Sequence, residues 1–172
     1  IDINLTQTGV LVRAPVLGQT LTVAGRYGYP GPLLELASGG EASLSYWDYQ
    51  FRLDGGTLRH GYTVFAYGAS DTLEGPGSDD RDGDGRTDPE FEDKDPPLEP
   101  VLTLTFHRID LRLYQRTGDI DGIYRVVLGY DESITGATTS VRTLSIEPRF
   151  SWRLQATPQL ELRAGLEGSF RD

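Results

Sequence analysis

The most constraining feature of the sequence is a strict alternation of apolar and polar residues near its C-terminal end. In the segment 144–154, "LSIEPRFSWRL", every even-numbered residue is apolar and every odd-numbered residue is serine, glutamate or arginine. An extended strand produces this period of two, because its successive side chains point to opposite faces, whereas a helix has a period of 3.6. The segment therefore predicts a long strand with one apolar face and one charged face.

The same alternation recurs along the chain, and no segment sustains a helical period. We therefore predict an all-β protein. The expected strands are eight, at about 1–14, 19–29, 41–53, 57–70, 101–116, 122–131, 140–154 and 159–171. Two of them change phase internally, which predicts β-bulges near Gly9 and His107.

The length of the expected strands distinguishes two architectures. Dividing 172 residues among eight strands gives about 21 residues for a strand with its connection. Soluble sandwiches use strands of about 5–6 residues with turns every 8–12, whereas a membrane-crossing strand needs about 9–11 residues plus overhang. The lengths favour a single domain over 1–172, an antiparallel up-and-down β-barrel of about eight long strands of the transmembrane type. The alternative is a soluble barrel or sandwich whose core is the apolar face.

The charged face fits a narrow lumen, where charges are tolerated when they are paired. An eight-stranded barrel is just wide enough for side chains to fill it. The residues expected on this face carry both signs on neighbouring strands and are Arg26, Asp48, Arg52, Asp110, Arg112, Arg125, Glu147, Arg149, Arg153, Glu161, Arg163 and Glu167.

Aromatic residues are expected near both sets of strand ends. The two groups are Tyr29, Tyr67, Tyr130 and Phe170 at one end, and Phe51, Tyr62, Tyr124 and Trp152 at the other. Two aromatic bands separated by aliphatic residues are typical of the girdles at membrane interfaces.

The stretch "RLQATPQLELRAGLEGSF", residues 153–170, resembles the strand–turn–strand sequences of bacterial outer-membrane β-barrels. The size of the chain resembles that of small barrels of the OmpA and OmpX kind. The expected connections 30–40, 71–100 and 132–139 are longer than the ones between them, which is the reverse of a free-standing barrel of this kind. A piece of a larger, porin-like or multi-chain barrel is therefore the other interpretation. The resemblance implies the bacterial outer membrane, with the lipid bilayer and other envelope or barrel chains as partners.

The segment 71–100 differs from the rest in charge. Between Asp71 and Glu99 there are 12 acidic and 3 basic residues, a net charge of −9, while the whole chain carries −10. We interpret this segment as an acidic loop inserted into a nearly neutral body. The sequence has no basic stripe that would neutralise phosphates, so nucleic acid is not an expected partner.

Within the acidic loop, carboxylates are spaced as in a calcium-binding loop. The segment starting at Asp80 has acids at positions 1, 3, 5 and 9 and glycine at position 6, as an EF-hand loop does, with a backbone carbonyl at position 7. It also resembles the calcium repeats of thrombospondin type 3. The predicted Ca²⁺ ligands are Asp80, Asp82, Asp84, Arg86 (through its carbonyl) and Asp88. Position 12 is Phe91 instead of a bidentate acid, and the alternative is a solvated acidic loop that binds no metal.

No enzymatic site is expected. The two histidines, His60 and His107, are far apart in sequence. The chain has no cysteine, so neither a disulfide framework nor a thiolate metal site is available. The sequence also has no methionine, from which we expect a processed or excised chain. The predicted function is that of an outer-membrane β-barrel with a structural or assembly role and a calcium-binding loop. The alternative is a soluble secreted or cell-surface protein, a calcium-stabilised adhesin or small-ligand binder.

Overall fold

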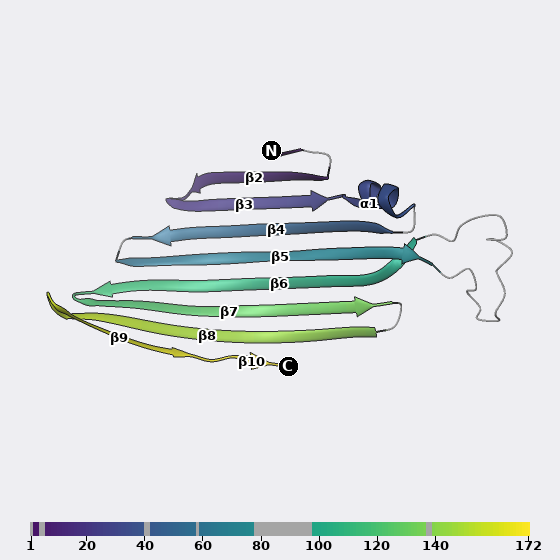
Figure 1. Ribbon diagram of the computed structural model, residues 1–172. Helices are drawn as coiled ribbons and strands as arrows, with labels where there is room; N and C mark the ends of the chain where they lie inside the picture. The colour runs from purple at the N-terminus through teal and green to yellow at the C-terminus, as the bar shows by residue number, and fades with distance from the viewer. Residues whose placement is uncertain (1, 4–5, 40–41, 58, 78–97, 137–138) are drawn as a thin grey trace, which may run out of the picture.

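The computed structural model describes residues 2–3, 6–39, 42–57, 59–77, 98–136 and 139–172. These residues form one antiparallel sheet in which strands that follow one another in sequence lie side by side (Figure 1). The elements are β1 (Asp2–Ile3), β2 (Gln7–Val16), β3 (Gln19–Gly28), α1 (Gly31–Ser38), β4 (Ser43–Gly56), β5 (His60–Pro76), β6 (Leu98–Thr117), β7 (Ile120–Thr135), β8 (Thr139–Thr157), β9 (Leu160–Glu167) and β10 (Phe170–Arg171). The prediction of an all-β, antiparallel, up-and-down chain is confirmed.

The eight predicted strands correspond in order to β2 through β9, with short additions at both ends. β10 prolongs β9, because Glu167 pairs with Arg149 and Phe170 pairs with Ile146 in the same register along β8. The predicted strand 1–14 is instead two strands, since Asp2 of β1 folds back to pair with Gly9 of β2. A bulge at Gly9 was the wrong explanation for the change of phase, because Gly9 pairs in an uninterrupted register with Arg26 and the chain reverses direction between β1 and β2.

The phase change in β6 is also not caused by a bulge. β6 pairs without interruption through His107 with both β5 and β7. Leu104 and Phe106 consequently lie on the same face of the sheet as Asp110. The register irregularity of this hairpin lies between Leu73 and Glu74 instead.

The connections at one end of the sheet, on the left of Figure 1, are short. We call this the short-turn end. Between Val16 and Gln19 the two turn residues Leu17 and Gly18 have φ angles of 49° and 79°. Positive φ at both central residues is the requirement of a type I′ turn, whose twist matches that of the strands it joins. The sequence thus builds tight hairpins at this end.

The opposite end carries α1 and the connection between β5 and β6 (Figure 1). The eight-residue helix was not predicted, because one or two turns are too short to establish a helical period. The strands also extend further than expected, since Pro76 pairs with Leu98 and Thr135 pairs with Thr139. The expected loops 71–100 and 132–139 are therefore strand at their ends.

The strand ends at the short-turn end are staggered. One row of mutually paired residues runs across the sheet through Arg13, Asp110 and Glu147. From this row to the last residue of the strand there are three residues in β2 (to Val16), seven in β6 (to Thr117) and ten in β8 (to Thr157). The strands are thus inclined to the line on which the turns lie.

The sheet is open. Among the described residues, one edge consists of β1 and the part of β2 that β1 does not cover, and the opposite edge consists of β9 and β10. The two edges are not paired with each other (Figure 1). The described strands alone therefore do not form the closed barrel that was predicted, because their two edges do not pair with each other.

Burial is inverted relative to an ordinary globular protein. Apart from glycines, four described residues are buried, namely Thr63, Asp110, Val127 and Ser145. The pairing places all four on one face of the sheet. Large aliphatic residues on the other face are exposed, for example Leu113 at 58% and Ile146 at 51%. The most enclosed part of this sheet is therefore its polar side.

Candidate functional site

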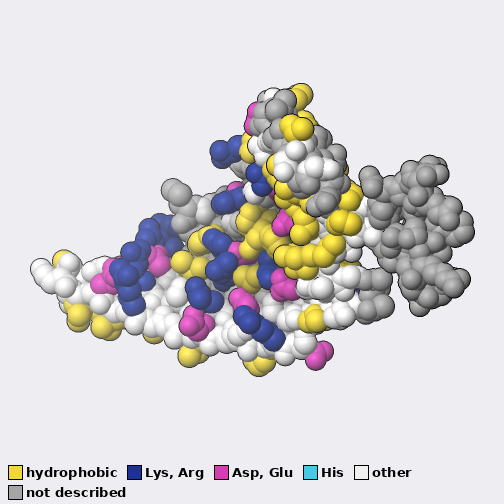
Figure 2. All heavy atoms as spheres, turned by 45° about the vertical axis from the view of Figure 1, so that its right-hand side comes forward, with side chains coloured by type: hydrophobic (Ala, Val, Ile, Leu, Met, Phe, Trp, Pro, Cys, Tyr) yellow, Lys and Arg dark blue, Asp and Glu magenta, His cyan; other side chains and the backbone are white. Residues whose placement is uncertain are grey.

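The face of the sheet that contains Asp110 is called the charged face. The register places on it all twelve residues that the alternation assigned to a charged face, from Arg26 to Glu167. Figure 2 shows arginine and acidic side chains gathered over this face and toward the short-turn end. Opposite charges on this face pair between neighbouring strands, for example Arg26 with Asp48 at 2.6 Å and Arg149 with Glu167 at 2.9 Å. The expected pairing across a lumen stays a prediction.

Asp110 is the centre of the charged face and is only 2% exposed. Its Oδ2 accepts hydrogen bonds from Nη2 of Arg112 at 2.5 Å and from Nη2 of Arg125, on β7, at 2.8 Å. Arg112 and Arg125 are directly opposite each other in the β6–β7 pair, a position in which like charges repel. The shared carboxylate offsets this repulsion and joins three charges from two strands.

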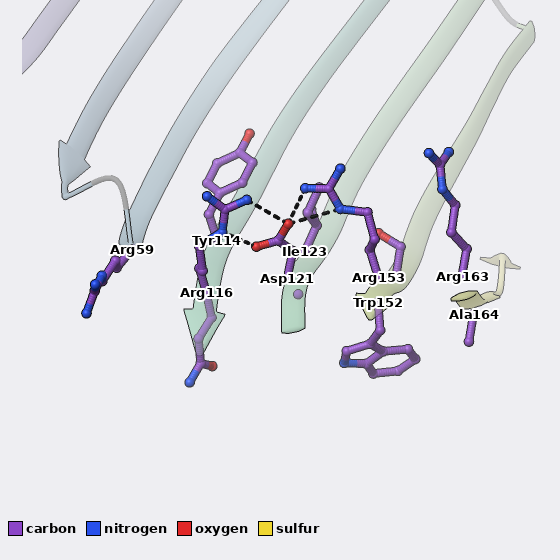
Figure 3. Close-up of a pocket in the computed structure, with 12 residues that line it drawn as sticks. Arg59, Tyr114, Arg116, Asp121, Ile123, Trp152, Arg153, Arg163 and Ala164 are labelled. Atoms are coloured by element: carbon purple, nitrogen blue, oxygen red, sulfur yellow. Dashed lines mark hydrogen bonds and ion pairs between the residues drawn. The ribbon is translucent and has the colours of Figure 1, made fainter. Parts of the chain in front are cut away.

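A second cluster lies at the short-turn end, around a cavity of about 600 Å³ (Figure 3). Arg116 on β6 and Arg153 on β8 both converge on the carboxylate of Asp121 on β7, with distances of 2.9 Å from Nη2 of Arg116 and 3.0 Å from Nε of Arg153. Arg163 of β9 is directly opposite Arg153, and Glu161 forms ion pairs with both. Arginine side chains therefore outnumber carboxylates here.

Sequence reasoning missed part of this second cluster. Arg116 and Asp121 flank the two-residue turn between Thr117 and Ile120, where the alternation ends. Pairing across the turn is what brings their side chains together, because Arg116 is directly opposite Asp121. The expected strands ended at 116 and began again at 122, so the alternation assigned Asp121 to neither face.

Toward its other end, the charged face carries more apolar residues. These are Leu44, Leu73, Leu102, Leu104 and Phe106, with Tyr67 in contact with Phe106. Asp71 and Asp131 lie opposite Leu104 and Phe106 on the same face. Figure 2 shows apolar side chains gathered toward the end from which the acidic segment leaves the sheet. The change of phase in β6 thus marks a change in the chemistry of this face along its length.

The opposite face, called the apolar face, carries aliphatic residues between two groups of rings. Toward the short-turn end lie Tyr62, Tyr124 and Trp152, where the indole Nε1 of Trp152 donates to the hydroxyl of Tyr124 at 3.2 Å. Toward the other end lie Trp47, Tyr49, His107 and Tyr130, whose rings are in contact with one another. Tyr67 does not belong to either group, because its register places it on the charged face.

Two features border the second group of rings. Gly68 allows Tyr49 and His107 to approach, since an added Cβ would lie 2.5 Å from Nδ1 of His107 and 2.6 Å from the carbonyl oxygen of Phe106. The Tyr49 hydroxyl and this Nδ1 are 3.2 Å apart. Beyond Tyr130, Glu132 binds Arg142 at 2.7 Å, and the guanidinium lowers the pKa of the Glu132 carboxyl below its ordinary value. Polar chemistry therefore resumes outside the rings.

The predicted calcium ligands Asp80, Asp82, Asp84, Arg86 and Asp88 all lie outside the described residues. In the described part of the chain, His, Asp and Glu side chains form no group that could hold a metal ion. No helix among the described residues is long and apolar enough to cross a membrane. His60 and His107 belong to different ends of the sheet and are not brought together.

Comparisons with models of protein families, with curated proteins and with solved structures gave no match to this chain.

Proposed function

We propose that this chain forms wall strands of a bacterial outer-membrane β-barrel, with the apolar face toward lipid and the charged face toward the lumen. In this proposal its role is structural or in assembly. The observation that carries it is the inverted burial. Asp110 is 2% exposed and fully paired, while aliphatic residues of the opposite face, such as Leu111, are exposed.

A soluble sandwich would need a second layer over the apolar face, because exposed contiguous apolar surface is rare on soluble monomers. The described strands all belong to one sheet, and α1 contacts β4 at one end of it. Lipid is a partner that would cover an apolar face of this extent. The same face would otherwise have to be covered by another protein.

The stagger of the strand ends supports a barrel. The number of residues between the row through Arg13 and Glu147 and the end of the strand is three in β2 and ten in β8. It thus rises by seven residues over the six strand-to-strand steps from β2 to β8. With about 3.3 Å per residue along a strand and about 4.8 Å between strands, this stagger corresponds to an inclination of about 40°. Barrels require strands inclined by about 35–45° to the axis. The turns would then lie in one plane at a membrane surface.

The width of the apolar band supports the same proposal. On β8 the apolar face carries six successive apolar side chains between Leu144 and Leu154. Ten residues of strand measure about 33 Å, and an inclination of about 40° reduces this length to a height of about 25 Å, which is the height of the apolar band of outer-membrane barrels.

Closure of the barrel requires partners for the two edges. β2 and β9 are separated by seven antiparallel steps and therefore run in opposite directions, so that they have the correct polarity to pair with each other. Pairing with further strands would instead give a larger barrel with an open channel. In both arrangements, the edges of the sheet assemble the barrel by pairing with another strand.

The acidic segment leaves and rejoins the sheet at adjacent points, because Pro76 pairs with Leu98. We propose that Asp80, Asp82, Asp84, the carbonyl of Arg86 and Asp88 bind Ca²⁺ in this loop. Calcium in the millimolar range should then protect the segment from proteolysis after Arg81 and Arg86. The double variant Asp82→Asn with Asp84→Asn should lose this protection while its melting stays unchanged. If calcium does not change the rate of proteolysis of the unaltered chain, that result would contradict a metal site in this segment.

Membrane insertion is tested by reconstituting the chain into phospholipid vesicles and washing them with high salt and with alkaline carbonate. An inserted barrel wall should stay with the vesicles and require detergent for release. Release by either wash, with the β-sheet signal in circular dichroism retained, would favour the soluble alternative. A chain with its strands scrambled provides the control for adsorption of unfolded protein.

A further inference from the structure

Arginine side chains gather around the cavity of Figure 3. Arg116, Arg153 and Arg163 come from three different strands and share the two carboxylates of Asp121 and Glu161. Elsewhere on the charged face most arginines have one acid each, as Arg149 has Glu167. The cluster therefore carries a surplus of positive charge.

The pairing of the strands makes this surplus costly. Arg153 and Arg163 are directly opposite across the β8–β9 pair, and like charges in that position repel. Glu161 approaches Nη1 of Arg153 at 3.8 Å and binds Arg163 through Nε, so it offsets the repulsion of the two guanidiniums only in part. Within the described residues, the two terminal nitrogens of Arg163 have no hydrogen-bond acceptor. These donors are available to a ligand.

The cavity has room for a ligand among these donors. Its volume is about 600 Å³, and its lining includes Arg116, Arg153, Arg163 and Arg59. In Figure 3 the side chains of Arg116 and Arg153 point toward one another across Asp121, and Arg163 stands beside Arg153, while Arg59 and Trp152 point away. Three guanidiniums on one side of a sheet match the several oxygens of a phosphate group, which guanidinium forks bind through paired hydrogen bonds.

We propose that this cluster binds a phosphate-bearing anion, with Arg163 and Arg153, which are directly opposite each other, as direct donors and Arg116 as a further positive charge. Asp121 and Glu161 occupy the guanidiniums in the absence of the anion and compete with it. The phosphate can belong to a free solute or to a lipid headgroup at the short-turn end. The inference depends on this cluster alone and does not require that the apolar face contact lipid.

The test is calorimetric titration of the 172-residue chain, refolded in a nonionic maltoside detergent without phosphate. Inorganic phosphate and a short-chain phosphatidate serve as the two probes. Saturable binding of inorganic phosphate indicates a free anion as ligand, and binding of the phosphatidate alone indicates a headgroup. Absence of saturable binding with both probes would overturn the proposal.

Three variants distinguish an anion site from a purely structural charge cluster. Arg163→Gln should weaken binding about tenfold, as expected for the loss of a charge-assisted hydrogen bond. Asp121→Asn should strengthen it severalfold, because a competing carboxylate is removed. Arg149→Gln, on the same face but outside the cavity lining, should leave binding within about twofold.

The sign of the effect at Asp121 decides the question. If the anion bound elsewhere and the cluster only supported the fold, Asp121→Asn would not strengthen binding, and that result would contradict the proposal. Circular dichroism of each variant checks that the sheet is intact. If Asp121→Asn fails to fold, Glu161→Gln removes the other competing carboxylate, and the same increase in affinity is expected.

Discussion

The two faces of β8 differ in both composition and surroundings. On the apolar face, Leu144 and Ile146 are more than half exposed, while Ser145 between them points to the charged face and is buried. A soluble sheet would bury the first two and expose the third. The difference teaches that, in the described part of this chain, the buried side chains are mostly polar ones on the charged face, while the large aliphatic side chains of the apolar face are exposed. Substitutions should therefore have opposite consequences on the two faces.

The largest effect is expected from a charge placed in the middle of the apolar face. Leu111 lies on β6 between the two groups of rings and is 40% exposed. If the face contacts lipid, Leu111→Arg should destabilise the inserted protein by about 2–4 kcal/mol, because a charge at the bilayer midplane loses its hydration. The measurement is urea unfolding in vesicles, followed by circular dichroism.

A matched control for this variant lies on the same strand and face. Gln115 is two residues from the end of β6, at the short-turn end. Gln115→Arg should cost no more than about 1 kcal/mol, because charges are tolerated near the interface. Equal losses of unfolding free energy in the two variants would show that the cost of a charge on the apolar face does not depend on its depth in a bilayer.

A smaller effect is expected at the centre of the charged face. Asp110→Asn removes the charge that holds Arg112 and Arg125 opposite each other. We expect a loss of about 1–3 kcal/mol in the free energy of unfolding, the usual result of removing a charged hydrogen-bond acceptor from a buried site. Asp48→Asn is the control, since Asp48 binds the single guanidinium of Arg26 and is more exposed than Asp110. A control as damaging as Asp110→Asn would contradict the central role of Asp110.

The smallest effect is expected where the charged face is open to solvent. Arg149 and Glu167 form an ion pair whose side chains are 60% and 72% exposed. Arg149→Gln should change the stability of the chain in detergent by less than about 0.5 kcal/mol, because exposed pairs contribute little. Thermal unfolding followed by circular dichroism measures this difference. A larger loss would indicate that Arg149 is enclosed, as closure of the barrel around it would produce.

The sequence predicted the strands and their two faces because alternation is a local property. Once a strand was recognised, the twelve charged-face residues could be assigned to one face from their odd or even positions along the strand alone. Parity could not explain the change of phase in β6, where Leu104 and Phe106 share a face with Asp110. Only the continuous pairing with β5 and β7 shows that this face changes from charged to apolar along its length.

Other features depended on contacts that the sequence does not contain. The fold-back of β1 onto β2 produces a change of phase that resembles a bulge when only the sequence is considered. The cluster around Asp121 arises from pairing across a two-residue turn and from the register between β8 and β9. Whether the edges of the sheet meet is a matter of curvature, on which alternation has no influence.

The most direct test of the account uses the two tryptophans of the chain as reporters. Trp47 and Trp152 both lie on the apolar face, among different groups of rings. In vesicles of brominated phospholipid, the fluorescence of both should be quenched, as measured with the single-tryptophan variants Trp47→Phe and Trp152→Phe. A tryptophan placed on the charged face, by Phe65→Trp in the variant that lacks both native tryptophans, should not be quenched. Equal quenching at position 65, or none at the native positions, would contradict the assignment of the apolar face to lipid.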